Sequence, residues 1–296
     1  MSTTATRLST HLRTWLLIAG LTGLLIAIGA VLGGGFLYLF AGLAVLMNVA
    51  GYWFSDRLAL KASRARPLAP HEAPRLEADV AELARRAGVP MPRLYSIPSP
   101  QPNAFATGRN PRHAAIAVTE GLLAHLPPDQ VKGVIAHEMA HIANRDILIS
   151  SIAAIVAGAI AAIANVLQFS LLFGGGGDED DSPLGWLGVL ATMIFAPLAA
   201  MLLQLGVSRQ REYLADATGA ELLGRGEPLA NALETLERGA QALPMAVNPA
   251  TASMYAVNPL PRAGVATLFM THPPLRERIR RLRALDARAA GVPVMA

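Results

Sequence analysis

Four long stretches of the chain are apolar and free of charge. They are Trp15 to Leu32, Phe36 to Phe54, Ile147 to Phe173 and Leu184 to Val207. An apolar run of about 18 residues or more is long enough to cross a bilayer as an α-helix. The pattern therefore predicts four transmembrane helices in two hairpins. The first run, which follows Arg7 and Arg13, also resembles a signal peptide, but a second run beginning after only Gly33 to Gly35 favours a hairpin.

The remaining segments show the periodicities of a folded domain. Apolar residues recur at helical spacing from Leu76 to Ala87, before Gly88, and short strands are predicted at Arg93 to Ile97 and His113 to Thr119. A helix is predicted from Asp129, as its N-cap, to about Arg145. Further helical patterns cover Ser208 to Leu223, Pro228 to Leu243 and a basic stretch around Leu275 to Leu282, and the residues Pro244 to Gly264 are expected to form a long loop.

Composition and charge support a membrane protein and give it an orientation. Hydrophobic residues make up 53% of the chain and charged residues 16%, too apolar a balance for an ordinary soluble protein. None of the 25 Lys and Arg residues lies in the glycine turn Gly33 to Gly35 or in the acidic stretch Gly174 to Pro183. Both termini and the long basic segment are therefore expected in the cytoplasm. Orientation accounts for the positive charge, so nucleic acid is not expected as a partner.

These patterns divide the chain into five parts. They are a cytoplasmic N-terminus (1–14), a transmembrane hairpin (15–54), a cytoplasmic segment (55–146), a second transmembrane hairpin with an acidic periplasmic loop (147–207) and a second cytoplasmic segment (208–296).

The sequence HEMAH, from His137 to His141, lies in the predicted helix that follows Pro128. Residues four apart share one face of a helix, so both imidazoles can bind the same Zn²⁺. Glu138 points to a neighbouring face, where it can act as general base on the metal-bound water without being a ligand. The alternative is that the histidines only form local hydrogen bonds. The chain has no cysteine, so a zinc site must use His and carboxylate ligands.

A catalytic zinc site needs a third protein ligand. The pattern that places a third His six residues further on is missing, because Asn144 and Ile147 stand where Gly and His would be. The later stretch SRQREYLAD places Glu212 and Asp216 one helical turn apart beside a predicted span. We expect Glu212 to be the ligand and Asp216 to accept a hydrogen bond from a zinc-binding imidazole. The reverse assignment stays open, as does a solvated pair without a role.

These residues resemble the HtpX-type membrane metalloproteases, relatives of the prenyl-protein endopeptidases. The resemblance covers nearly the whole chain and rests on HEMAH, on EYLAD from Glu212 to Asp216 and on NAFATG from Asn103 to Gly108. It implies zinc ligands at His137, His141 and Glu212, a catalytic Glu138, and a role in clearing damaged or misfolded proteins of the bacterial inner membrane. The expected fold is a mainly α membrane protein whose four transmembrane helices carry a cytoplasmic α+β, zincin-like metalloprotease domain assembled from two segments.

A protein substrate is expected to add as an extended strand to a sheet edge beside the one zinc ion. His113 to Thr119 is the predicted edge strand, and Asn103 and Ala104 are predicted to form the opposite wall, although both are equally typical of a turn. His272 is a candidate donor to the oxyanion or else a structural cap, and Arg209 is a weaker candidate.

Two other functions are compatible with parts of this pattern. A catalytically inactive adaptor or stress sensor, stabilised by zinc, would need the ligands but not a base beside them, so Glu138 favours the enzyme. A metal transporter would carry ionisable residues in its spans, and the four runs contain none. The sequence predicts membrane proteins as substrates but neither the individual substrates nor the oligomeric state.

Overall fold

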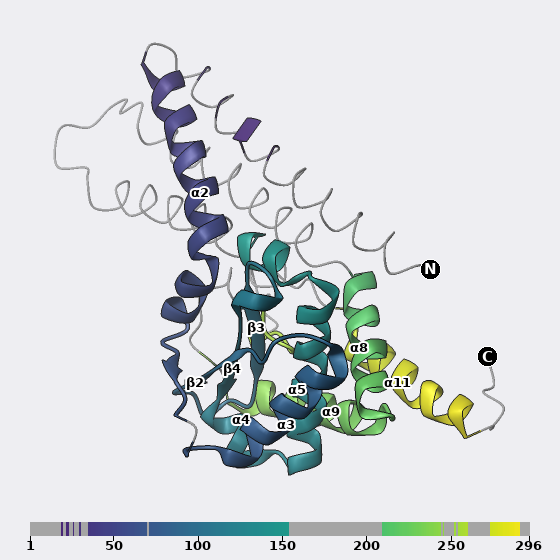
Figure 1. Ribbon diagram of the computed structural model, residues 1–296. Helices are drawn as coiled ribbons and strands as arrows, with labels where there is room; N and C mark the ends of the chain where they lie inside the picture. Colours follow the sequence, from purple (N-terminus) through teal and green to yellow (C-terminus); the bar gives the residue numbers. More distant parts are fainter. Residues whose placement is uncertain are drawn as a thin grey trace, which may run out of the picture.

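The computed structural model describes residues 35–69, 71–153, 209–243, 254–259 and 273–290, with a few single positions besides. Within these ranges α2 extends away from a body built of helices and one sheet (Figure 1). The elements in chain order are α2 (Phe36–Ala62), β1 (Arg66–Pro67), α3 (Pro74–Ala87), β2 (Arg93–Ile97), β3 (Ala104–Gly108), the 3-10 helix η1 (Pro111–His113), β4 (Ala114–Thr119), α4 (Glu120–His125), α5 (Pro128–Asn144), α8 (Arg209–Leu223), α9 (Glu227–Ala242) and α11 (Leu275–Ala289).

The sheet has the strand order β1-β2-β4-β3. β4 runs parallel to β2 and antiparallel to β3, so it is a central strand and β3 is an edge strand. The prediction that His113 to Thr119 forms the edge is wrong: His113 belongs to η1, and Ala114–Thr119 is hydrogen-bonded to a strand on each side. All six residues of β4 are buried, which explains why its sequence is continuously apolar up to Thr119.

The helix α3 confirms the pattern from Leu76 to Ala87. It begins with Pro74 in its first turn and ends at Gly88, whose φ of 65° is a left-handed conformation that glycine adopts without strain. Leu76, Val80 and Leu83 form its buried face. This face packs in the same core as α5.

The helix α5 lies at the centre of the domain, in contact with α3, β3, α8 and α9. Its residues from Gly133 to Ala140 are all buried. The predicted helix is confirmed, but Asp129 is not its cap: Pro127 occupies that position without a side-chain hydrogen bond, and Asp129 lies in the first turn. Because α5 is buried throughout this stretch, polar side chains such as His137 and Glu138 depend on neighbouring elements for partners.

The second segment supplies α8, α9 and α11, close to the predicted helices at 208–223, 228–243 and around 275–282. α8 and α9 pack on α5, and α11 packs on α8 and α9. Ile279 and Leu282 of α11 are buried in this interface. The apolar face of the basic helix α11 thus packs on the domain itself.

The second predicted span, Phe36 to Phe54, lies within α2, where Tyr38, Leu46 and Trp53 are exposed. Across the residues that the structure describes, no helix combines the length and the apolarity needed to cross a membrane. The other three runs fall outside these residues, apart from single positions of the first run and residues 147–153 of the third. The arrangement of four spanning helices therefore stays a prediction.

Candidate metal centre

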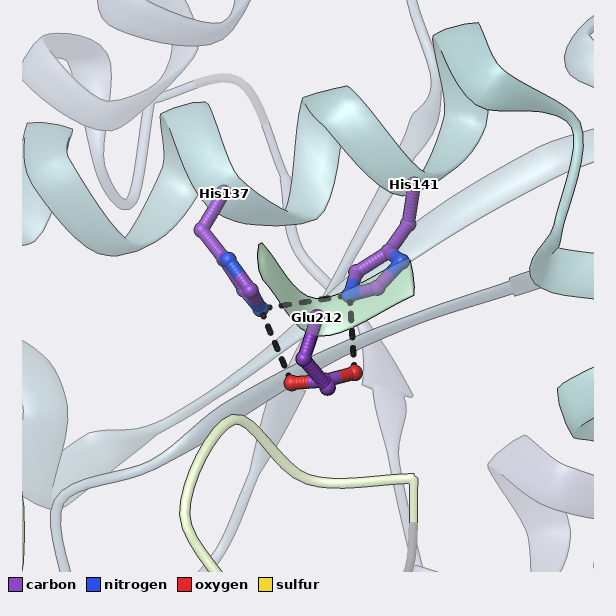
Figure 2. A group of neighbouring side chains, drawn as sticks. All are labelled: His137, His141 and Glu212. Atoms are coloured by element: carbon purple, nitrogen blue, oxygen red, sulfur yellow. Dashed lines mark hydrogen bonds and ion pairs between the residues drawn. The ribbon is translucent and has the colours of Figure 1, made fainter. Parts of the chain in front are cut away.

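Two histidines of α5 and a glutamate of α8 direct their donor atoms toward one another (Figure 2). Nε2 of His137 lies 3.2 Å from Nε2 of His141. Oxygens of the Glu212 carboxylate lie 3.8 Å from the first nitrogen and 3.5 Å from the second. A tetrahedral zinc ion with bonds of about 2.1 Å holds its ligand atoms about 3.4 Å apart. The three side chains have the spacing that one Zn²⁺ requires.

Each of the two imidazoles also has a carboxylate next to its other ring nitrogen, Nδ1. Nδ1 of His137 lies 3.0 Å from Asp216, and Nδ1 of His141 lies 3.1 Å from Asp146. A neutral imidazole held in this way carries its proton on Nδ1 and leaves a lone pair on Nε2. When both imidazoles are neutral, their two lone pairs and the Glu212 carboxylate face one point, and they repel one another unless a proton or a metal ion lies between them. The chemistry of these donors thus fits a divalent metal ion.

The two acidic residues of α8 occupy different places in this cluster. Glu212 faces the Nε2 atoms of both histidines, whereas Asp216, one turn later, faces Nδ1 of His137. Of these two acids, Glu212 is the one that joins the histidines in the group of described residues whose donor atoms all lie within 4.8 Å of one another. The geometry favours Glu212 as the ligand and Asp216 as the supporting acceptor over the reverse.

Asp146 is a site residue that sequence reasoning missed. α5 ends at Arg145, which adopts a left-handed conformation with φ of 60°. The N–H of Asp146 then donates to the carbonyl of His141 at 3.2 Å, and this turn brings the carboxylate back to the imidazole. The only sequence signal is an acidic residue directly after a helix that carries a ligand in its last turn.

Arg278 of α11 is a second residue that was missed. Its side chain is fully buried and holds the Asp216 carboxylate with two hydrogen bonds, from Nε at 2.8 Å and from Nη2 at 2.7 Å. Nη1 donates to the carbonyl of Ala256 at 3.1 Å and lies 3.5 Å from Glu212. Five arginines lie between 276 and 283, and the one sequence signal is that Arg278 shares a helix face with Leu275 and Leu282.

A cavity of about 20 Å³ lies beside the cluster. Its lining residues are Ala106, His137, Glu138, His141, Ile147, Ser150, Glu212, Met254, Tyr255 and Ala256. The volume is sufficient for a single water molecule. Glu138 is buried in this lining, and its carboxylate accepts a hydrogen bond from the backbone N–H of Ala106 on β3. Two carboxylates and two imidazoles therefore border the same small space.

Burial and neighbouring charges shift the pKa values of this cluster. Burial raises the pKa of Glu138 above its ordinary range, with His137 and His141 acting in the opposite direction. Burial lowers the pKa of His141, but the charge and hydrogen bond of Asp146 outweigh it and raise the pKa to about 10. For Asp216, burial raises the pKa, and the charge and hydrogen bonds of Arg278 outweigh it and lower the pKa to about 2.

The other predicted site residues have different surroundings. Asn103 is buried, with its side chain donating to the carbonyl of Val257 at 2.7 Å. Ala104 is buried at the start of β3, and its carbonyl accepts from the N–H of Ala256. Arg209 is exposed at the start of α8 and is not among the described residues that line the cavity. His272 lies outside the described residues.

Relatives with about half of their residues identical to this chain match nearly its whole length. A "Protease HtpX homolog" of Syntrophobacter fumaroxidans is 51% identical over 283 residues, which cover 94% of this chain and 100% of the relative. Proteins with the same description from Persephonella marina and Pyrococcus furiosus are 52% and 48% identical, covering 95% and 92% of this chain and 99% and 95% of their own lengths.

The family model "Peptidase family M48" matches residues 70–286, which include the two histidines, Glu212 and Arg278. Among solved structures, the "Crystal Structure of S. mikatae Ste24p" matches with a TM-score of 0.48 and 20% identity, covering 94% of this chain and 67% of that one. The family match and the relatives confirm the resemblance found in the sequence. This chain belongs to peptidase family M48 and is a metalloprotease.

Proposed function

We propose that this protein is a zinc-dependent endopeptidase in which His137, His141 and Glu212 bind Zn²⁺ and Glu138 is the catalytic base. The proposal rests on one observation: a His-His-Glu cluster and a further buried carboxylate border the same cavity. When bound, Zn²⁺ would polarise the carbonyl of the peptide bond and make water easier to deprotonate.

Glu138 would take a proton from the attacking water and pass it to the nitrogen of the leaving amine. Its buried position raises its pKa, which makes it a stronger base than an exposed glutamate. The N–H of Ala106 fixes the carboxylate in place and connects it to the edge strand β3. Asp216 and Asp146 would hold the ligand imidazoles in the tautomer that offers Nε2 to the metal.

The extended substrate would lie along the outer edge of β3, which replaces the central strand β4 as the candidate. Ala106 of β3 lines the cavity. The carbonyl of Ala104 and the N–H of Ala106 both point away from β4, since they bond to Ala256 and to Glu138. Backbone groups further along this edge could pair with a peptide main chain, which suits a protease that accepts many side chains.

We place the active site at the cytoplasmic face of the bacterial inner membrane, with misfolded or damaged membrane proteins as substrates. The four apolar runs and the distribution of Lys and Arg support this placement, as does the row of exposed apolar side chains on α2. The proposal keeps the five parts predicted from the sequence: cytoplasmic residues 1–14, 55–146 and 208–296, and transmembrane hairpins at 15–54 and 147–207. Substrates that share the bilayer would reach the site by diffusing in two dimensions.

A catalytically inactive adaptor or sensor is the alternative function. Zinc would then only join α5 to α8, and a base beside the ligands would have no purpose. A structural zinc site is usually closed by a fourth protein ligand. The group of possible ligands among the described residues has three members, which favours the enzyme.

Replacing Glu138 with Gln tests the proposal in the full chain purified in detergent. We expect Glu138→Gln to keep its zinc and to lose casein cleavage by at least about a hundredfold, the contribution of a general base. Glu221→Gln, which makes the same change at an exposed residue of α8, should match the wild type. Unchanged cleavage by Glu138→Gln would overturn the base assignment, and wild-type protein that takes up no zinc would overturn the whole proposal.

A further inference from the structure

Arg278 connects the C-terminal helix to three residues of the metal centre. Its guanidinium binds both oxygens of Asp216, and Nη2 lies 3.4 Å from the ring nitrogens of His137. Nη1 lies 3.5 Å from Glu212. One planar side chain from α11 thus contacts a ligand from α5, a ligand from α8 and the acceptor that orients the first of them.

The same guanidinium fixes the segment that covers the cavity. Nη1 donates to the carbonyl of Ala256, and the N–H of Ala256 donates to the carbonyl of Ala104 on β3. Met254, Tyr255 and Ala256 line the cavity, but Arg278 is not among its lining residues. Arg278 therefore has no route to a substrate or to the cavity except through the groups that it holds.

Charge explains why a fully buried arginine is tolerated here. Glu138, Asp146, Glu212 and Asp216 are four buried acids of this centre. A bound Zn²⁺ would offset two of their negative charges, and Arg278 offsets a third. A bidentate guanidinium also fixes the plane of a carboxylate, which a single ammonium group does not.

We propose that Arg278 is a positioning residue for the zinc centre, through which α11 orients Asp216 behind His137 and fixes the segment Met254–Val257 over the cavity. The inference rests on the proposed zinc site. It assigns the C-terminal helix to the active centre itself, as the element that completes it.

Zinc affinity tests this inference separately from activity. In the full chain, Arg278→Lys keeps the positive charge but loses the bidentate hydrogen bonding to Asp216. We expect its zinc affinity, measured by competition with a chelator, to fall about 10- to 100-fold, as for other residues that orient zinc ligands. The absorption spectrum of the Co²⁺-loaded variant should also change, and kcat should fall with little change in KM. Arg280→Met, on the exposed face of the same helix, should match the wild type.

A double variant separates positioning from simple charge compensation. Arg278→Met alone leaves Asp216 buried without its partner, and the variant is expected to be unstable. Arg278→Met combined with Asp216→Asn removes both charges, so we expect folding to recover while zinc affinity stays low. Wild-type zinc affinity in this double variant or in Arg278→Lys would overturn the role of Arg278 and leave the zinc site intact. A wild-type protein without zinc would overturn both proposals.

Discussion

Both carboxylate oxygens of Asp146 lie 3.1 Å from Nδ1 of His141. The contact spans five residues and depends on the left-handed conformation of Arg145, which turns the chain back at the end of α5. His137 receives its carboxylate from α8, in a different segment of the chain. The two histidines are therefore oriented by different means, one by the local turn and the other by tertiary packing.

Asp146→Asn is expected to weaken zinc binding by about tenfold, because an amide is a weaker acceptor for Nδ1–H and does not stabilise the imidazole charge. Because Asp146 also raises the pKa of His141, competition with a chelator is measured from pH 7 to 10, and the affinities are compared where the imidazole is neutral in both proteins. Asp129→Asn, on the exposed first turn of the same helix, serves as the control and should bind zinc like the wild type. Equal affinities in the two variants would show that Asp146 does not support the ligand.

Zinc affinity should rise with pH across the neutral range. The pKa of His141 in the metal-free protein is raised to about 10, so its imidazole is protonated at pH 7 and must lose this proton to bind a metal ion. The affinity is therefore expected to increase about tenfold per pH unit between pH 7 and 9. Chelator competition at several pH values gives this slope. A slope of zero would mean that His141 is already neutral before zinc binds.

The metal-free protein should show the opposite trend in its stability. The pKa of His141 rises from 6.5 to about 10 in the folded protein, so the charged imidazole stabilises the fold fully below pH 6.5. This stabilisation is lost as the pH rises through 10. Thermal unfolding of the chelator-treated chain should therefore occur at lower temperature at pH 9.5 than at pH 6.5. The difference should shrink in Asp146→Asn, which lacks the charge that raises this pKa.

The elements with a clear local periodicity were predictable from the sequence. The face from Leu76 to Leu83 with its terminal Gly88, the strand Arg93–Ile97 and the helix that carries HEMAH all appear where expected. The pairing of Glu212 with the histidines also followed, because a zinc site without cysteine needs a third His or carboxylate donor and the stretch SRQREYLAD places Glu212 and Asp216 one helical turn apart beside a predicted span.

Contacts between residues that are far apart in the sequence could not be predicted from local periodicity. The strand β3 has Phe105 as its only large residue and lies between a Pro-rich and a Gly-rich turn, so its sequence has no strong strand signal. Which of β3 and β4 forms the edge depends on pairing across the sheet, which periodicity does not encode. Arg278 differs from the neighbouring arginines by its burial and by its contacts with Asp216, Glu212 and Ala256, which depend on tertiary packing.

Gly133 of α5 should not tolerate a larger residue. A Cβ at this position would lie 2.8 Å from the backbone of Pro228 and Leu229, so α9 would have to move away from α5. We expect Gly133→Ala to lower the free energy of unfolding by about 1–3 kcal/mol, the usual cost of overpacking. Gly42→Ala, at a helical glycine with open space around it, should leave stability unchanged or slightly higher. Denaturant unfolding of both variants tests the difference.

The hydrogen bond from Ala106 to Glu138 gives a prediction about catalysis. Proline at position 106 removes the N–H that stabilises the charged carboxylate, so the pKa of Glu138 should rise further. A base must be deprotonated to act, and the acid side of the pH profile of kcat/KM should therefore move to higher pH.

The ladder between β3 and β4 should survive Ala106→Pro, because the N–H of Ala106 points to Glu138 and not to β4. Ala106→Gly, which keeps the N–H, is the matched control and should show the wild-type profile. If the proline and glycine variants had the same acid limb, Glu138 would not be the base that this profile reports. The same proline within β4 would instead break pairing on two sides, so loss of cleavage there would report unfolding and not a substrate site.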